Sequence, residues 1–220
     1  MASFTEENYL KAIYHLSEQK TDESVSTNEL AEVTQTRAAS VTDMLKKLAD
    51  KNYINYKKYQ GVKLTEKGNV LALKIIRKHR LWEVFLVEKL GFKWDEIHDL
   101  AEELEHIKST ELTSKLDKFL GYPKFDPHGD PIPDEAGNLP ENKTFKLSET
   151  EKNKPLLILG VSEDSSQFLR HLDKLGLKLG LKIMVNEISE FDQSVEIVIE
   201  GERKIRLSAE VSKNIHVIYK

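Results

Sequence analysis

Apolar residues in the first third of the chain recur at helical spacing. In FTEENYLKAIYHLSE, residues 4–18, they fall three and four positions apart and predict an amphipathic helix with Thr5 as its candidate N-cap. STNELAEVTQ begins with a capping-box pattern, Ser26 or Thr27 ahead of Glu29, and predicts a short second helix. A third helix follows within a few residues, because SVTDMLKKL repeats apolar positions at i, i+4 and i+7 from its valine.

Two short β-prone runs come next and are joined through YQG, where Gly61 suits a tight turn. Helix, short helix, turn, helix and hairpin is the order of a winged helix-turn-helix. Its third helix would read a groove of DNA, and its hairpin would follow the phosphates. The candidate DNA contacts on these elements are Arg37, Ser40, Thr42, Asp43, Lys46, Lys47, Lys57, Lys58 and Lys63.

The middle of the chain is helical and ends in a proline-rich stretch. Residues 65–90 are too apolar for a helix with one exposed face, so this segment is expected to bridge two domains or lie in a dimer interface. KWDEIHDLAEELEHIK predicts the next helix, and STELTSKLDKFLG a further one that stops at Gly121. Residues 122–150 hold five of the six prolines, which indicates a linker or ordered loop at a domain boundary.

The last third changes to a period of two. KPLLILGV, LKIMVNEI, SVEIVIEG, RKIRLSAEV and IHVIYK are short β-branched runs, and DSSQFLRHLDKLG is one short helix among them. Short strands packed this densely predict a small β-barrel. The fold class is therefore mainly α with a small β domain.

Charge is divided unevenly along the chain. The formal net charge is -4, yet residues 35–80 carry 12 Lys or Arg against 3 Asp or Glu, whereas residues 81–135 carry 6 against 14. A basic segment followed by an acidic one suggests one surface for polyanions and another for cations. There is no cysteine, so any metal must be held by nitrogen and oxygen donors. No apolar run suggests a membrane span and no signal peptide is recognisable, which favours a cytoplasmic protein.

The acidic segment concentrates potential metal ligands. On one helix, positions 98, 102, 105 and 106 would share a face, and the preceding helix adds His79 and Glu83 one turn apart. Such a set of nitrogen and oxygen donors suits a first-row divalent metal. Taken singly, each of these residues could equally be a solvated charge or a capping or core histidine.

Enzymatic motifs do not fit this pattern. HExxH is absent, HxxEH fails because Glu102 stands where its first His belongs, and Glu103 with His106 makes only one ExxH. No phosphate loop or nucleophile motif is present. An enzyme is therefore not expected. Two other classes stay open: a metal-independent DNA-binding or interaction protein whose acidic helices serve only dimerisation, and a metal-binding carrier or enzyme.

Five segments of the sequence belong together: ENYLKAIYHL, SVTDMLKKL, RKHRL, EELEH and DPHGDPIP. Together they resemble the diphtheria toxin repressor family of iron- and manganese-dependent transcriptional regulators, and the resemblance covers essentially the whole chain. It implies a homodimer that binds a palindromic double-stranded operator near metal-uptake genes, with bound metal as co-repressor. It also implies a DNA-binding domain at 1–72, a metal-binding and dimerisation domain at 73–140, a linker at 141–154 and an SH3-like, FeoA-type barrel at 155–220.

The resemblance further implies two metal sites in each subunit. The primary site would consist of Asn8, Glu102, Glu105 and His106. For the second site the resemblance implies His79, Glu83 and His98 with Asp164 and Gln167 from the barrel domain. It also points to His128 as a ligand position, with Asp126 in place of a family cysteine. Which combination of these residues forms the second site is left open.

Two positions bear on the identity of the metal. Glu102 stands where iron-type members carry Cys, and a hard carboxylate there suits Mn²⁺ better than a soft thiolate would. Position 8 is Asp in manganese-type members and Met in iron-type members, whereas this chain has Asn8. An amide oxygen can coordinate but brings no charge, so it should weaken the site. Mn²⁺ is the first expectation and Fe²⁺ the alternative.

Overall fold

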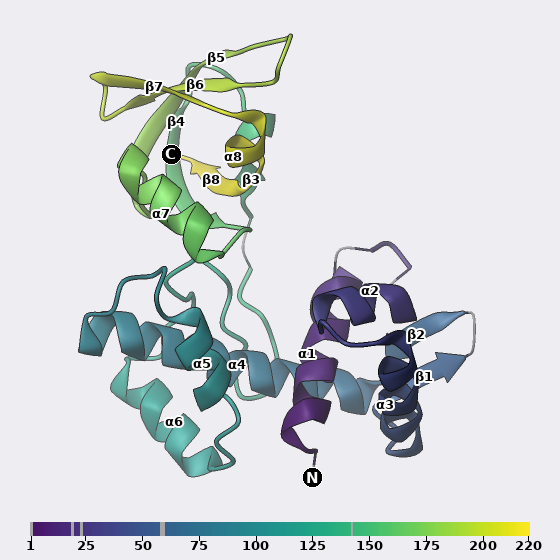
Figure 1. The fold of residues 1–220 in the computed structure, drawn as a ribbon. Helices are drawn as coiled ribbons and strands as arrows, with labels where there is room; N and C mark the ends of the chain where they lie inside the picture. Colours follow the sequence, from purple (N-terminus) through teal and green to yellow (C-terminus); the bar gives the residue numbers. More distant parts are fainter. Residues whose placement is uncertain (1, 19, 23, 58–59, 142) are drawn as a thin grey trace. The chain divides into compact units, whose positions relative to one another are not determined.

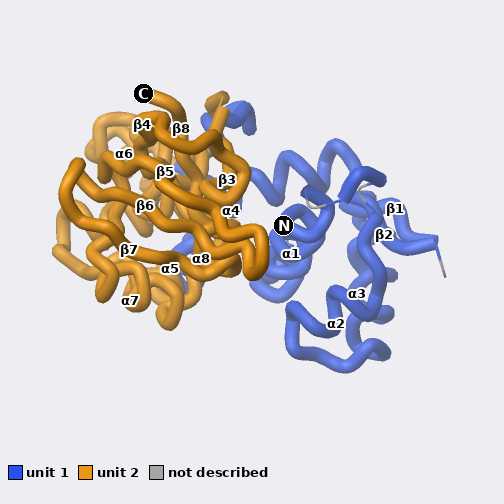
Figure 2. The backbone as a smooth tube through the Cα atoms, turned by 90° about the horizontal axis from the view of Figure 1, so that it is seen from above, with its two compact units in different colours: residues 1–79, 102–110, 133–139 blue, residues 80–101, 111–132, 140–220 orange. Residues whose placement is uncertain are grey.

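The computed structural model describes residues 2–220 except residues 19, 23, 58–59 and 142. The chain forms two compact units (Figure 2), and the boundary between them cuts across helices. Unit 1 comprises residues 1–79, 102–110 and 133–139, and unit 2 comprises residues 80–101, 111–132 and 140–220. The predicted domain boundaries remain predictions.

The start of unit 1 is the predicted winged helix-turn-helix (Figure 1). Its elements are α1 (Phe4–Glu18), α2 (Thr27–Val33), α3 (Ala38–Asp50), β1 (Ile54–Lys57) and β2 (Gly61–Leu64). The strands pair antiparallel with Ile54 opposite Leu64. Apolar residues from all three helices and both strands pack into one core, with Leu10, Leu45 and Val62 completely buried. That core fixes the third helix relative to the first.

Helix capping confirms one sequence prediction and contradicts another. Ser26 caps α2, and its capping box with Glu29 is complete. Thr5, however, lies inside α1, so its prediction as N-cap was wrong. Ser3 fills that place: its hydroxyl accepts from the amide of Glu6, and its own amide donates to the Glu6 carboxylate.

The central helices are α4 (Glu66–Leu90), α5 (His98–Leu104) and α6 (Thr110–Phe119). Among the described residues, no helix is both long enough and apolar enough to cross a membrane. α5 is much shorter than predicted, because a turn precedes His98 and the amide of Ile107 bonds back to the carbonyl of Leu104 in a tight final turn. Glu105 and His106 therefore lie beyond the helix, and the prediction that they share one helical face with His98 was wrong.

The C-terminal part of unit 2 is a six-stranded antiparallel sheet with strand order β3-β8-β4-β5-β6-β7. The strands are β3 (Phe145–Lys146), β4 (Pro155–Val161), β5 (Lys182–Ile188), β6 (Val195–Ile199), β7 (Arg203–Leu207) and β8 (Ile215–Tyr219). Between them lie η1 (Leu147–Glu149), the predicted helix α7 (Ser166–Leu175) and the short α8 (Ala209–Lys213). All five predicted strands are present, and β3 adds a strand inside the stretch predicted as a linker. Alternate apolar side chains of this sheet and the apolar face of α7 make the core.

Candidate metal centres and DNA-binding face

The first candidate centre lies in unit 1 around Glu105, whose side chain is completely buried. His79, on α4, places Nδ1 2.6 Å from Glu105 Oε2. The ligand atoms of His79, Glu102 and Glu105 lie within 4.8 Å of one another. Lys11, on α1, donates from Nζ to both Glu105 oxygens at 2.8 Å and also to Glu102 Oε1. We call these four residues together with His106 the Glu105 cluster.

α1 also contacts His106 of the Glu105 cluster. His106 Nδ1 lies 2.6 Å from Glu7 Oε2, and the ring of Phe4 packs on the imidazole with centroids 3.7 Å apart. Asn8 shares a face of α1 with Lys11, because the two are three residues apart. Residues of α1 therefore contact the segment that follows α5.

Two buried atoms at this place have no hydrogen-bond partner among the described residues. They are Asn8 Oδ1 and His106 Nε2. A buried polar atom is normally paired, and an orphaned amide oxygen and imidazole nitrogen near carboxyl groups are the donors a first-row divalent cation takes. Asn8, Glu102, Glu105 and His106 therefore fit the metal that the sequence led us to expect.

The charge state of Glu105 suits a ligand. Burial pushes the pKa of its carboxyl upward, but the hydrogen bond with His79 and the positive charge of Lys11 outweigh burial and hold the pKa below its ordinary value. Glu105 is therefore ionised at neutral pH, as a metal ligand must be.

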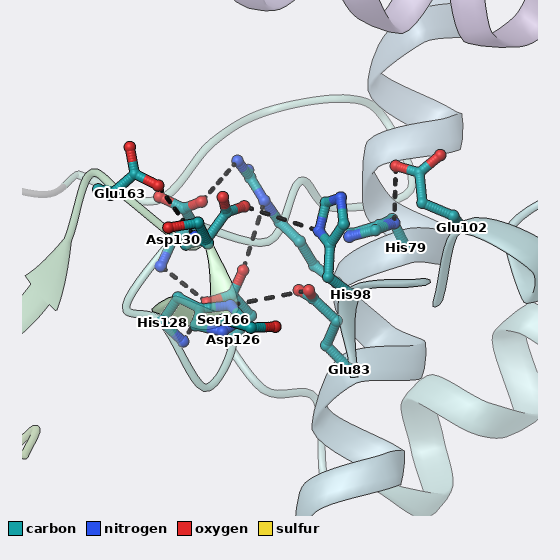
Figure 3. Close-up of polar contacts among 12 residues, drawn as sticks. His79, Glu83, His98, Glu102, Asp126, His128, Asp130, Glu163 and Ser166 are labelled. Carbon is teal, nitrogen blue, oxygen red and sulfur yellow. Dashed lines mark hydrogen bonds and ion pairs between the residues drawn. The ribbon is translucent and has the colours of Figure 1, made fainter. Parts of the chain in front are cut away.

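The second candidate centre lies in unit 2 and joins Glu83 of α4 to the loop that contains Asp126 and His128 (Figure 3). All three side chains are buried, and one ligand atom from each falls within 4.8 Å of the others. His128 Nδ1 is 3.7 Å from Glu83 Oε1, and His128 Nε2 is 2.9 Å from the carbonyl oxygen of Trp94. Because a carbonyl oxygen only accepts, Nε2 carries a proton, and Nδ1 is the ring nitrogen that lies near Glu83. We call these three residues the Glu83 cluster.

The loop of the Glu83 cluster is held by backbone contacts. Asp126 Oδ1 accepts from the amides of His128 and Asp130 at 2.8 and 2.9 Å. Gly129 has φ +90°, and a Cβ there would come within 2.1 Å of the Leu159 carbonyl oxygen, so only glycine allows the loop to lie against β4. Arg80 Nε lies 3.6 Å from Asp126 Oδ2. This close packing brings the loop carboxylate to α4.

Electrostatics in the Glu83 cluster differ from those around Glu105. Burial, followed by the negative charges of Glu83 and Asp130, raises the pKa of Asp126 well above its ordinary value, and Arg80 offsets this only in part. Carboxyl groups that resist ionisation together are expected to gain from a divalent cation between them.

Among the other predicted ligands, His98 offers a ring nitrogen within 4.8 Å of a ligand atom of Glu83, and both residues belong to unit 2. His98 Nδ1 is 3.7 Å from Asp164 Oδ2, and both side chains are about half exposed. Gln167 is exposed on α7, where it lines a surface hollow. His79 belongs to unit 1 whereas Glu83 and His98 belong to unit 2, so the predicted set that combines them stays a prediction.

The predicted DNA contacts lie on α3 and on the hairpin. The following residues have exposed side chains: Arg37, Ser40, Asp43, Lys46, Lys47, Lys57 and Lys63. Thr42 is partly buried and donates to the Ala38 carbonyl oxygen. Asp43 pairs with Lys46 at 3.2 Å. Lys58 lies outside the described residues. The described side chains leave a basic face on α3 and on both strands of the hairpin, as nucleic-acid binding requires.

Sequence reasoning missed three polar residues of these centres: Glu7, Lys11 and Arg80. A signal for Lys11 was available, since it lies one helical turn after Asn8. A lysine in an acidic site is not an expected ligand, however, and only the fold brings it to Glu102 and Glu105.

Family models match the chain in three consecutive stretches. The iron dependent repressor N-terminal DNA binding domain matches residues 1–62, the iron dependent repressor metal binding and dimerisation domain matches residues 65–134, and the FeoA domain matches residues 145–219. The kinds of domain and their order along the chain are those expected from the sequence.

Individual proteins are similar over long stretches. The HTH-type transcriptional regulator MntR of Oceanobacillus iheyensis is 35% identical over 54% of this chain and 80% of its own length. The iron-dependent repressor IdeR of Mycobacterium leprae is 27% identical over 97% of this chain and 96% of its own. A solved manganese-dependent transcriptional repressor in complex with manganese is 33% identical, covers 98% of this chain and 100% of its own, and has a TM-score of 0.88. The chain therefore belongs to the iron-dependent repressor family.

Proposed function

We propose that this protein is a transcriptional repressor that binds an operator when Mn²⁺ or Fe²⁺ is bound, with Mn²⁺ as the first choice. The observation that carries this function is the Glu105 cluster: buried metal-type donors meet α1, which packs in one core with the reader helix α3. The similar proteins are manganese- and iron-dependent regulators by description, and they support both halves of the proposal.

For the primary site we propose Asn8, Glu102, Glu105 and His106 as ligands. A bound divalent cation would offset the negative charge of the two carboxylates and would accept electron pairs from these oxygen and nitrogen donors. His79 would not bind this metal itself. Its Nδ1 is hydrogen-bonded to Glu105 and would orient that carboxylate. Glu7 orients His106 in the same way.

For the second site we propose the Glu83 cluster. The support is the burial of all three donors and the orientation of His128, whose proton on Nε2 leaves Nδ1 to coordinate. His98, Asp164 and Gln167 are more exposed, and this makes them weaker candidates.

We propose that metal acts on DNA binding through α1. Asn8 would be held to the segment 102–106, and α1 touches the turn before α3, where the Tyr9 hydroxyl is 3.0 Å from Thr36 Oγ1. Fixing α1 would thereby fix the reader helix. In a homodimer this would set the distance between two reader helices to match half-sites about one helical turn apart. The metal can favour DNA binding only as far as it prefers that arrangement.

The protein would work as a homodimer on a palindromic duplex in the cytoplasm, without enzymatic activity. The basic side chains of α3 and the hairpin would contact phosphates, while Ser40, Thr42 and Asp43 would face base edges. Metal-uptake genes are the proposed targets.

Calorimetric titration with Mn²⁺ tests the sites. Wild-type protein should bind stoichiometric Mn²⁺, and Glu105→Gln should lose the primary site. Glu111→Gln removes the same charge from an exposed ion pair with Lys115 and should bind as the wild type does. Wild-type protein that takes up no Mn²⁺ or Fe²⁺ would contradict the proposal and favour a protein whose acidic helices serve only dimerisation.

A further inference from the structure

The ammonium of Lys11 is fully engaged by carboxylates of the Glu105 cluster. Nζ lies 2.8 Å from each oxygen of Glu105 and also contacts Glu102 Oε1. An ammonium has three N–H donors, so these three acceptors satisfy it completely. The side chain of Lys11 is 12% exposed and that of Glu105 is not exposed at all, so the pair is poorly screened by water.

We infer that Lys11 is a tethered cation which competes with the metal for Glu102 and Glu105 and so sets the metal concentration at which the protein responds. The inference rests on the proposed primary site. In the metal-free protein the single charge of Lys11 offsets part of the negative charge of the two carboxylates, and binding of a divalent cation requires Nζ to leave them.

The charges require this exchange. A carboxylate oxygen that accepts from Lys11 has its charge partly satisfied, and a divalent cation beside the remaining ammonium would be repelled by it across a few ångströms of poorly screened space. Lysine can leave at modest cost, because its flexible four-carbon stem lets the ammonium reach water while the stem stays packed. Arg80 does not play this role at Asp126, since its guanidinium is also bound by the Pro131 carbonyl oxygen.

A purely structural role for Lys11 predicts the opposite outcome. If the lysine only held Glu105 in place, its removal would weaken metal binding, because the ligand would lose its orientation. If it competes, its removal leaves buried carboxylates uncompensated in the metal-free state and strengthens metal binding. The sign of the change in affinity therefore distinguishes the two roles.

The test compares full-length wild type, Lys11→Met and Lys20→Met by Mn²⁺ calorimetry and by thermal unfolding with and without Mn²⁺. Lys20→Met removes the same charge from a pair with Glu29 outside the Glu105 cluster. We expect Lys11→Met to bind Mn²⁺ about tenfold more tightly or better, which corresponds to about 1.4 kcal/mol. Its metal-free form should melt at lower temperature, and Mn²⁺ should raise its Tm more than it raises that of the wild type. Lys20→Met should bind as the wild type does.

Unchanged or weaker Mn²⁺ affinity in Lys11→Met would overturn the competition. Lys11→Gln provides a second uncharged variant should Lys11→Met fail to fold, and the same signs are expected of it. Lys11→Arg keeps the cation and should stay close to wild-type affinity. If the wild type itself bound no Mn²⁺ at the primary site, the proposed function would fail first, and the two failures are thereby distinguished.

Discussion

Lys51, at the C-cap of α3, donates hydrogen bonds from Nζ to both carboxylate oxygens of Glu6, at 2.7 and 2.8 Å. Glu6 lies two residues before Asn8 on α1, and its side chain is 7% exposed. Tyr9 makes a second contact at the other end of α3, through Thr36. α1 therefore contacts both ends of the reader helix α3, through Glu6 and Tyr9, and these two residues flank the proposed metal ligand Asn8 in the sequence.

Glu6→Gln should weaken the coupling between metal and DNA without weakening metal binding. The amide keeps the size of the side chain but loses the ion pair with Lys51, so movement of α1 would be passed less completely to α3. We expect Mn²⁺ affinity in the absence of DNA to stay within about twofold, while the factor by which Mn²⁺ raises DNA affinity falls severalfold.

Fluorescence anisotropy with labelled duplex, with and without Mn²⁺, measures that factor. Glu18→Gln removes the same charge at the far end of α1 and controls for general electrostatics. Equal Mn²⁺ enhancement in Glu6→Gln and wild type would show that the contact carries no coupling.

Asn8→Asp should strengthen the primary site. Asn8 Oδ1 is buried without a hydrogen-bond partner among the described residues, and a carboxylate there would add the negative charge that Mn²⁺ prefers. Calorimetry should give about tenfold tighter Mn²⁺ binding for Asn8→Asp and weaker binding for Asn8→Ala. If both variants matched the wild type, position 8 would not be a ligand.

Asp126→Asn should remove the second site while sparing the metal-free fold. Burial and the charges of Glu83 and Asp130 raise the pKa of Asp126, so a neutral amide of the same shape relieves an unfavourable charge and keeps its acceptor oxygen. We expect one Mn²⁺ fewer per chain and a metal-free Tm equal to or above that of the wild type. Asp130→Asn, in the same loop but half exposed, should keep full stoichiometry. Two tightly bound ions in Asp126→Asn would rule out this ligand.

The stabilising effect of Glu29 should depend on pH. Hydrogen bonds from Lys20 and from Ser26 lower the pKa of Glu29 from 4.5 to about 2. Because the pKa is lower in the folded state, the contribution is present above about pH 4.5 and is lost as pH falls toward 2. Urea unfolding should therefore show Glu29→Gln less stable than wild type at pH 6, with the gap narrowing below pH 4.5 and closing only as pH approaches 2. A gap that stays constant with pH would mean that the charge of Glu29 is unimportant.

Local patterns predicted the elements well, and tertiary contacts explain where they failed. The capping box at Ser26 was readable because both partners lie three residues apart, and the strands were readable from alternation. The end of α5 after Leu104 could not be predicted, because no glycine or proline follows it closely to mark the end of a helix. Glu105 is turned inward there by His79 and Lys11, which are distant along the chain.

The candidate sites were predictable as residue types but not as partners. Glu102, Glu105 and His106 could be recognised within one segment. That Lys11 would fill the carboxylates, or that the Trp94 carbonyl would fix the proton of His128, depends on backbone positions set by the whole fold.

Affinity for a duplex selected from a random library, measured in Mn²⁺ and in chelator for wild type and Glu105→Gln, tests the central claim most directly. We predict a palindromic site that the wild type binds at least tenfold more tightly with Mn²⁺, and a Glu105→Gln variant whose affinity does not respond to Mn²⁺. Equal wild-type affinity in Mn²⁺ and in chelator would contradict the account.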